Sequence, residues 1–162
     1  MPHTEHRRDD QFSISTDPAR LEMAVIHRYL TEESYWAKNI PLETVTRAIA
    51  NSLNFGLYAP DGQLAGFARV VTDRATFAWL CDVFVLPAYR GQSLSKWLMQ
   101  VVWAHPELQG LRRQLLATRD AHGLYQQFNF QPLAAPELYL EIKHPNPYGA
   151  ETASTESSNA VN

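Results

Sequence analysis

The stretch FAWLCDVFVLPAYRGQSLSKWLM, residues 77–99, decides the fold of this chain. Its first nine residues are largely β-branched and aromatic at both odd and even positions, which is typical of a strand covered on both faces. Pro87 ends the strand because proline has no amide N–H to donate. From Leu94 onwards apolar residues recur at the spacing of one helix face. The stretch therefore predicts a strand, a basic loop that contains glycine, and a helix.

A helix that starts after such a loop favours an anion. The free N–H groups of its first turn and the positive end of its dipole both attract negative charge. Arg90 and Lys96 add a cation on either side. A phosphate group is the natural ligand of this arrangement. An ordinary strand-to-helix turn with solvated basic residues has the same composition, so these features alone leave both interpretations open.

Composition limits what the rest of the chain can be. Its 162 residues are 45% hydrophobic and 19% charged, as expected of one soluble domain with a substantial core. Seventeen acidic residues against 14 basic ones, with no long basic tract, argue against a nucleic-acid surface. The single cysteine, Cys81, excludes an intramolecular disulfide, and no run resembles a signal peptide or a membrane span. We expect a cytoplasmic protein that binds neither nucleic acid nor membranes.

The remaining strands and helices follow from hydrophobic periodicity and turn signals. Further strands are expected around residues 12–15, 55–58, 64–72, 114–117, 130–133 and 138–142, and further helices after Pro18, after Pro41 and over residues 121–128. Asp61 and Gly62 give a tight-turn signal between two of these strands, which predicts a hairpin. We expect a flexible N-terminus over residues 1–11, one domain over residues 12–143 and a disordered tail over residues 144–162. His3 and His6 belong to the frayed terminus, and no metal site is expected.

Two local patterns resemble the GNAT superfamily of N-acetyltransferases. The run from Val85 to Gly91, followed by Leu94 and a Lys-Trp-Leu helix, resembles the family's motif A, whose loop binds the pyrophosphate of acetyl-coenzyme A. The family places a glycine or alanine at a later loop position, whereas Ser93 and Ser95 stand at the small positions here. If residue 93 requires a positive φ, a side chain there costs about 1–2 kcal/mol.

The second pattern lies near the C-terminus. Ala121, Leu124, Tyr125 and Phe130 stand at the offsets of a motif that many family members carry, with Thr118 in place of an asparagine and Asn129 in place of a glycine. Asparagine tolerates the left-handed conformation that often closes a helix, so the second replacement is physically reasonable.

The resemblance implies a fold, a reaction and a cofactor site. The fold is α/β (α+β mixed), with a mixed central sheet of about six to seven strands flanked by about four helices. The reaction moves an acetyl group from acetyl-coenzyme A to a primary amine of a small molecule, by direct attack in a ternary complex. A catalytically degenerate acyl-coenzyme A-binding or interaction module is the alternative, and a homodimer is compatible with the sequence. The implied cofactor-binding residues are Phe84, Val85, Arg90, Gly91, Gln92, Ser93, Leu94, Ser95 and Lys96.

The resemblance also assigns catalytic roles. Tyr125 is the implied donor to the departing thiolate, since a phenol with a pKa near 10 stays protonated at neutral pH. Asp82 is the best-placed carboxylate to remove the proton of an amine whose reference pKa is about 10.4, either directly or through a water path. Packing of Tyr125 on the sheet and local pairing of Asp82 are the simpler alternatives. Adjacent strand residues point to opposite faces, so Cys81 and Asp82 are not both expected to face the cleft.

Tyr35 and Trp36 are the candidate substrate residues. They lie between the first two helices, which in this family cover the acceptor cleft, and Glu32 and Glu33 precede them. An aromatic and acidic wall would suit a cationic amine. A hydrophobic clasp with solvated glutamates is the simpler interpretation. The family also leaves the central strand splayed from the next one, which would free a backbone N–H near Val85 for the oxyanion.

Overall fold

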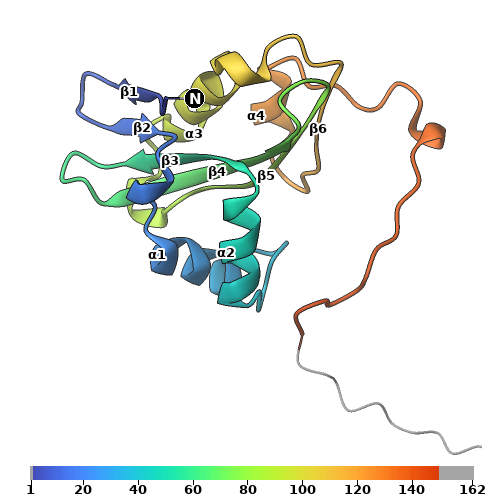
Figure 1. Cartoon of the computed structure of the whole chain (residues 1–162), viewed down its shortest axis with the longest axis horizontal. Coiled ribbons are helices and arrows are strands. Elements are labelled where there is room, and N and C mark those ends of the chain that lie inside the picture. Colours follow the sequence, from blue (N-terminus) through green and yellow to red (C-terminus); the bar gives the residue numbers. More distant parts are fainter. Residues whose placement is uncertain (1, 150–162) are drawn as a thin grey trace, which may run out of the picture.

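A six-stranded mixed sheet forms the centre of the protein, as seen in the computed structural model, which describes residues 2–149 (Figure 1). The strands follow each other across the sheet in chain order: β1 (Glu5–Arg7), β2 (Ser13–Ser15), β3 (Leu53–Tyr58), β4 (Leu64–Thr72), β5 (Phe77–Val85) and β6 (Arg113–Leu116). Every neighbouring pair is antiparallel except β5 and β6, which are parallel. The mixed α/β architecture expected from the sequence is confirmed.

Helices cover both faces of this sheet (Figure 1). On one face lie α1 (Met23–Arg28) and α2 (Leu42–Ala50), and on the other lie α3 (Leu94–Ala104) and α4 (His122–Gln126). The connection from β5 through α3 returns the chain to the same end of the sheet, which is why β6 runs parallel to β5. The two faces carry separate cores. The α1–α2 cluster comprises Ile26, Tyr29, Leu30, Ala37, Ile40, Val45, Ile49, Tyr58, Leu64, Phe67 and Phe84, whereas α3 packs on Phe55, Leu57, Val70 and Leu80.

The stretch at residues 77–99 folds as its pattern predicts. β5 covers all nine expected residues, a short 3-10 turn (Pro87–Tyr89) follows, and α3 begins at Leu94. The predicted hairpin is also present, because β3 pairs antiparallel with β4 and Gly62 takes a φ of +86° in the turn. The first strand of this hairpin is longer than expected, because β3 begins at Leu53 and not at residue 55.

The first helix is only partly as expected. Asp17 accepts a hydrogen bond from the Ala19 amide and Pro18 follows it, but this helical start lasts for one 3-10 turn (Pro18–Arg20). The α-helix begins later, at Met23, and continues as a π-helical turn (Tyr29–Glu33). The π-helical turn shifts the register of the buried face. The sequence pattern predicts Leu21, Val25 and Tyr29 on the inner face; Tyr29 is buried together with Ile26 and Leu30, whereas Leu21 and Val25 are half-buried at the border of the same cluster.

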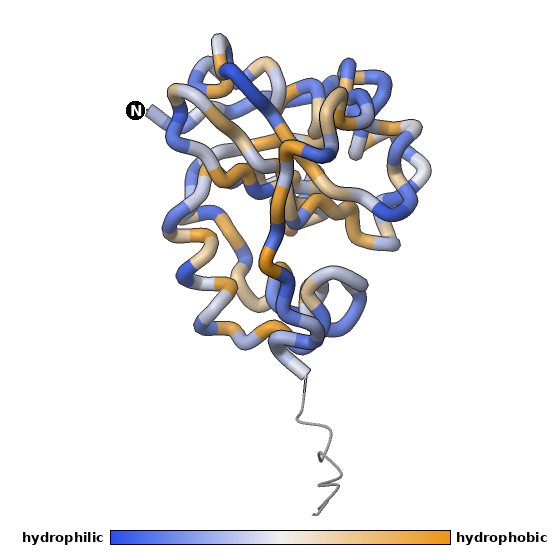
Figure 2. The backbone as a smooth tube through the Cα atoms, turned by 90° about the vertical axis from the view of Figure 1, so that its right-hand side faces the viewer, coloured by the Kyte–Doolittle hydropathy of each residue, from blue (hydrophilic) through white to orange (hydrophobic). Residues whose placement is uncertain are grey.

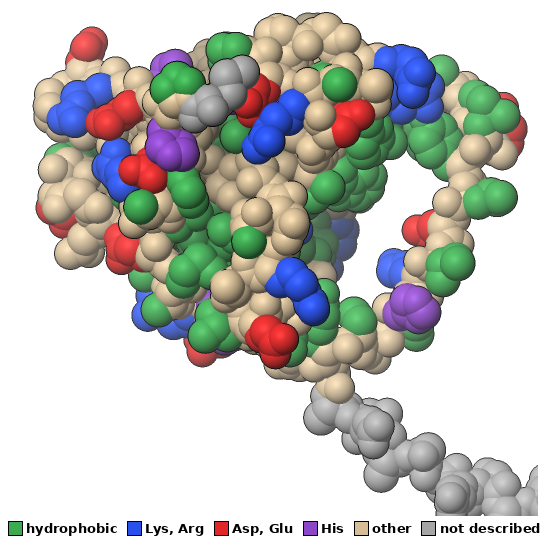
Figure 3. Space-filling model, viewed as in Figure 1, with side chains coloured by type: hydrophobic (Ala, Val, Ile, Leu, Met, Phe, Trp, Pro, Cys, Tyr) green, Lys and Arg blue, Asp and Glu red, His purple; other side chains and the backbone are tan. Residues whose placement is uncertain are grey.

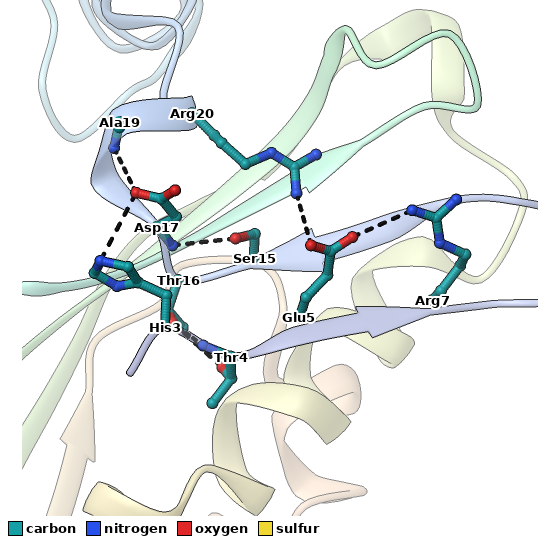
Figure 4. Close-up of polar contacts among 9 residues, drawn as sticks. All are labelled: His3, Thr4, Glu5, Arg7, Ser15, Thr16, Asp17, Ala19 and Arg20. Atoms are coloured by element: carbon teal, nitrogen blue, oxygen red, sulfur yellow. Dashed lines mark hydrogen bonds and ion pairs between the residues drawn. The ribbon is translucent and has the colours of Figure 1, made fainter. Parts of the chain in front are cut away.

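The prediction of a flexible N-terminus is wrong, because β1 lies within residues 1–11. The amide of Thr4 donates to Thr16 Oγ1 at 2.8 Å and the amide of Thr16 donates to the Thr4 carbonyl at 3.1 Å (Figure 4). Glu5 forms ion pairs with Arg7 at 3.2 Å and Arg20 at 3.4 Å. All three residues of β1 are exposed. Backbone pairing and polar side-chain contacts fix this strand without a buried face, so hydrophobic periodicity could not indicate it.

The two short strands predicted near the C-terminus are not formed either. In the described part of the chain no strand follows β6, and residues 138–142 extend away from the body after a 3-10 turn (Pro136–Leu138) (Figure 1). Figure 2, which faces this side of the molecule, shows the segment in front of the body. A strand needs a neighbour for its backbone groups, and none lies beside this segment.

The first residues of the predicted disordered tail, 144–149, include contacts with the body of the protein. Tyr148 is half-buried and packs against the α1–α2 cluster, and the Gly149 amide donates to the Asn146 carbonyl at 3.0 Å. The rest of the predicted tail, residues 150–162, lies outside the described residues. Between residues 2 and 149, no helix combines the length and apolar character that crossing a membrane requires.

Candidate functional site

The parallel strands β5 and β6 separate in the middle of β5. They pair from Phe77 with Arg113 as far as Leu80 with Leu116, and β5 then continues alone to Val85. The expected splay is therefore present. A cleft of about 440 Å³ opens where the strands diverge, a volume within the range of small-molecule sites. Its walls are formed by Tyr35, Trp36, Trp79, Leu80, Cys81, Asp82, Val83, Leu116, Ala117, Thr118, Arg119, Asp120, Ala121 and Tyr125.

A β-bulge in β5 places Asp82 at the cleft. Phe84 pairs with Phe67 and Cys81 with Arg69, so two residues of β5 stand opposite one residue of β4. Asp82 takes a left-handed φ of +51° at this point. Cys81 and Asp82 both line the cleft, which corrects the expectation that they face opposite sides. The bulge interrupts the strict alternation on which that expectation relied.

Asp82 connects the loop between α1 and α2 to the sheet. Its Oδ1 accepts a hydrogen bond from Trp36 Nε1 at 2.9 Å, and its Oδ2 accepts one from Arg69 Nε at 2.7 Å. Arg69 also donates to Ser52 Oγ at 3.0 Å. The side chains of Arg69 and Asp82 are only 16% and 11% exposed, so this ion pair is largely shielded from water. Each carboxylate oxygen keeps a further lone pair that could accept a proton.

Tyr35 and Trp36 lie in the wall of the cleft, as predicted, but their polar and aromatic groups already have partners. The Tyr35 hydroxyl accepts a hydrogen bond from the Arg119 amide at 3.1 Å. The Arg119 guanidinium lies over the same ring, 3.9 Å from its centre. This face of Tyr35 is thus occupied by a protein cation. Glu32 and Glu33 are exposed and do not line the cleft, which agrees with the simpler interpretation of solvated glutamates.

Tyr125 is carried by α4 and is buried against the sheet, where it also contributes to the cleft wall. Burial raises the pKa of its phenol from 10 to about 12. The hydroxyl therefore stays protonated over the whole physiological range. Asn129, just after α4, has a φ of +66°, which agrees with the reasoning that asparagine replaces glycine in a left-handed position.

The loop before α3 has the geometry of an anion site. Gly91 and Ser93 have φ values of +79° and +57°, a pattern that turns successive amides toward a common point. No side chain caps the start of α3, so its first-turn N–H groups remain available. Ser93 therefore meets the condition, a positive φ, under which its side chain costs backbone energy.

Three cations surround this loop, one of which the sequence did not predict. Arg90 donates to the Val85 carbonyl at 3.0 Å and to the Tyr29 hydroxyl at 3.2 Å, so it braces the loop. Lys96 is exposed on the first turn of α3. Arg8 donates to the Gln92 carbonyl at 3.1 Å from a segment that had been expected to be frayed. No local pattern links residue 8 to residue 92, and only tertiary structure brings them together.

Three other predicted cofactor residues are core residues. Phe84 stacks on Tyr29 with ring centres 4.0 Å apart, and Phe84, Val85 and Leu94 are all buried. Only their backbone groups could face a ligand. Trp79, Arg69 and Arg119 belong to the cleft or its supports but were not predicted, because nothing in their local sequence distinguishes them from ordinary strand and loop residues.

The anion site and the cleft fit different parts of one ligand. The amides and cations at the start of α3 suit a pyrophosphate, and the adjoining cleft suits a small organic group. Within residues 2–149, no cluster of three or more His, Cys, Asp and Glu side chains could hold a metal ion. Fold and site together combine a helix start with the geometry of an anion site and a cleft at the point where the sheet splays.

Comparison with known proteins identifies the family. The model of the acetyltransferase (GNAT) family matches residues 16–130, so the chain belongs to this family. A crystal structure of a proposed GNAT acetyltransferase from Xanthomonas campestris pv. campestris is 49% identical, with a TM-score of 0.83, and the match covers 93% of this chain and 99% of that one. Protein FG08082 of Gibberella zeae, also a proposed acetyltransferase, is 30% identical over 135 residues, 70% of this chain and 75% of its own length.

A more distant structure shares the fold alone. It is a proposed acetyltransferase from Clostridium acetobutylicum crystallised with acetyl-coenzyme A, 11% identical with a TM-score of 0.55, and the match covers 88% of this chain and 96% of that chain. Acetyl transfer from acetyl-coenzyme A is the general reaction of the family to which the present chain belongs.

The left-handed serine leads to a stability prediction. We expect Ser93→Gly to raise the free energy of unfolding by about 0.5–1 kcal/mol, because glycine adopts a positive φ without steric cost. The matched control is Ser95→Gly, inside α3, which should lower it by about 0.5 kcal/mol through lost helix propensity. Urea unfolding of both variants measures the difference. A destabilised Ser93→Gly protein would contradict the expected strain.

Proposed function

We propose that this protein is an acetyl-coenzyme A-dependent N-acetyltransferase whose acceptor is the primary amine of a small molecule. The observation that carries the proposal is that the uncapped start of α3 follows β5, the strand whose residues 79–83 line the cleft where β5 and β6 separate. That arrangement supports binding of a pyrophosphate at one end and of an acyl group with its acceptor at the other. The proposed pyrophosphate ligands are the amides of residues 91–96, with Arg8 and Lys96 as nearby cations.

The reaction is a direct displacement in a ternary complex. The neutral amine nitrogen attacks the thioester carbonyl carbon, a C–N bond forms, and the C–S bond then breaks with its electron pair on sulfur. The amine proton passes to a base, and the thiolate leaves as coenzyme A. While the carbonyl oxygen carries negative charge, a backbone N–H on the unpaired edge of β5 near Val85 could stabilise it.

The cleft favours an acceptor with an apolar or aromatic body. Its apolar lining includes Trp36, Trp79, Leu80, Val83 and Leu116. Its charged side chains are Asp82, paired with Arg69, together with Arg119 and Asp120. A polycation would find little uncompensated negative charge there. We therefore propose a monoamine with a hydrophobic group rather than a polyamine.

A turnover screen tests the function directly. Purified protein is incubated with acetyl-coenzyme A and amines of several classes, and the release of coenzyme A thiol is followed with time. We expect turnover with at least one hydrophobic primary amine, and thermal stabilisation by acetyl-coenzyme A well above its dissociation constant. Stabilisation without turnover across all classes would instead favour a binding module. The absence of both turnover and thermal stabilisation would contradict the proposal.

Tyr125 is the proposed donor to the departing sulfur. Burial raises the pKa of its phenol to about 12, which keeps the proton on the oxygen and disfavours its complete transfer to sulfur. A hydrogen bond to the developing thiolate needs no such transfer. We therefore propose that Tyr125 stabilises the leaving group mainly as a hydrogen-bond donor.

Replacement of this hydroxyl gives a prediction. Tyr125→Phe keeps the ring, so the variant should fold and bind acetyl-coenzyme A, while kcat falls by about 10²-fold. Tyr58→Phe is the matched control, because it removes another buried hydroxyl that does not line the cleft, and it should keep full turnover. Melting temperature and rate are measured on the same preparations. Full activity in folded Tyr125→Phe would remove Tyr125 from the mechanism.

Asp82 is the proposed acceptor of the amine proton, directly or through a water molecule. In the direct case Asp82→Asn should lower kcat by about 10²-fold and abolish the rise in rate with pH, while affinity for coenzyme A is retained. Asp120→Asn is the matched control, an exposed carboxylate at the same cleft. If Asp82→Asn keeps the wild-type pH profile and only raises KM for the amine, Asp82 acts by holding Trp36.

A further inference from the structure

A second cavity lies between α2 and the strands β4 and β5, and we call it the inner chamber. Its volume is about 250 Å³, and its apolar walls include Leu30, Ala37, Ile40, Val45 and Ile49. All five of these residues are buried. A cavity of about 150 Å³ is enough to hold benzene, so the inner chamber has room for one ring or a short alkyl chain.

The inner chamber and the cleft share a wall. Trp36, Cys81 and Asp82 line both cavities. The hydrogen bond of 2.9 Å from Trp36 Nε1 to Asp82 Oδ1 therefore lies at the boundary between them. Trp36 is 40% exposed, so packing holds its indole less firmly than a core side chain. Rotation of this indole away from Asp82 would join the two cavities.

The position of Asp82 divides the two cavities between the two substrates of a ternary complex. Tyr125, the proposed donor to sulfur, lines the cleft and lies outside the inner chamber. A thioester within reach of Tyr125 therefore occupies the cleft. The attacking nitrogen must lie close to the thioester carbon, and at Asp82 it can also lose its proton. From there, the inner chamber is the free space for the carbon body of the amine.

Two small side chains on α2 keep the inner chamber open. Thr44 and Ala48 are half-buried, lie one helical turn apart and contribute to its wall. The outer wall includes Tyr148, and open space separates the segment before Tyr148 from the body of the protein (Figure 3). The helix is therefore the wall that limits the depth of the chamber. A larger side chain at residue 44 or 48 would fill part of this space.

We propose that the inner chamber binds the apolar body of the acceptor amine, and that Thr44 and Ala48 limit its size. This inference rests on the proposed acetyltransferase function and narrows its substrate class to primary amines on a short alkyl chain or a single-ring arylalkyl group. Binding displaces the Trp36 indole, so Asp82 Oδ1 becomes free to accept a hydrogen bond from the amine.

The chamber also disfavours a second positive charge on the acceptor. The Arg69 guanidinium contributes to its wall, and the other walls are largely apolar. An ammonium group placed there would lose its hydration and face a like charge. We therefore expect n-hexylamine to be a better acceptor than 1,6-diaminohexane, which has the same carbon chain with a second amine.

Kinetics with n-alkylamines from ethylamine to n-octylamine test the size limit. In the wild type, kcat/KM should rise by about fourfold for each methylene buried, until the chamber is full. Thr44→Leu should lower kcat/KM for n-hexylamine by about tenfold or more and leave that for ethylamine within about twofold. Ala48→Leu is a second variant with the same expected result. Equal losses along the series, or a wild-type profile in both folded variants, would overturn the inference.

The matched control is Thr46→Leu. It makes the same substitution on the same helix, at an exposed residue that lines neither cavity. This variant should keep the wild-type dependence on chain length. A change of profile in Thr46→Leu equal to that in Thr44→Leu would show an effect on the helix rather than on the chamber, and would also overturn the inference.

Nuclear magnetic resonance separates this inference from the proposed function. With coenzyme A bound, n-hexylamine should shift the indole N–H signal of Trp36, assigned by its loss in Trp36→Phe, and Thr44→Leu should weaken this response. A shift in a protein that acetylates no amine would leave the chamber as a binding site and contradict the proposed function. Turnover of n-hexylamine without any shift would leave the function and overturn the inference. Absence of both would overturn both.

Discussion

The separation of β5 from β6 after Leu80 is the constraint on which the site depends. Up to that residue the two strands share a ladder, and their side chains close the core against α3. Beyond Leu80, the backbone groups of each strand need another hydrogen-bond partner and the side chains need another surface to pack against. β5 meets this need with antiparallel pairing to β4 and a bulge, and the space beside it becomes the cleft. α3 begins after the end of the same strand, so β5 positions both the cleft and the candidate anion site.

The bulge at Asp82 turns this opening into a defined site. By adding one residue to β5, it directs Asp82 into the cleft alongside Cys81 and within reach of Trp36 and Arg69. The two hydrogen bonds of Asp82 tie the loop after the first helix to the centre of the sheet. Arg119 and Tyr35 form a second connection between that loop and the chain beyond β6. The acceptor side of the cleft is thus held by contacts between three separate parts of the chain.

Burial sets the chemical state of the groups in this cleft. The thiol of Cys81 and the phenol of Tyr125 both have a pKa raised to about 12, because neither anion would be well solvated where it lies. Cys81 is therefore a poor nucleophile at neutral pH, which favours direct attack by the amine over a covalent acyl-cysteine. Tyr125 remains a neutral donor under the same conditions. Burial thus argues against an acyl-cysteine intermediate and favours direct attack by the amine.

The sequence by itself determined the parts of this protein that depend on local patterns. Hydrophobic periodicity and turn signals located β5, α3 and the β3–β4 hairpin. The family motifs drew attention to residues 93 and 129, where glycine or a small residue is usual, and both are left-handed here. Tertiary structure alone decided the rest. β1 is held by backbone pairing without a buried face, Arg8 reaches a loop 84 residues away, and the bulge at Asp82 overrides strand alternation. Residues 138–142 have the pattern of a strand but no partner strand among residues 2–149. Local patterns report which face of an element is apolar, whereas pairing partners and long-range polar contacts depend on the whole fold.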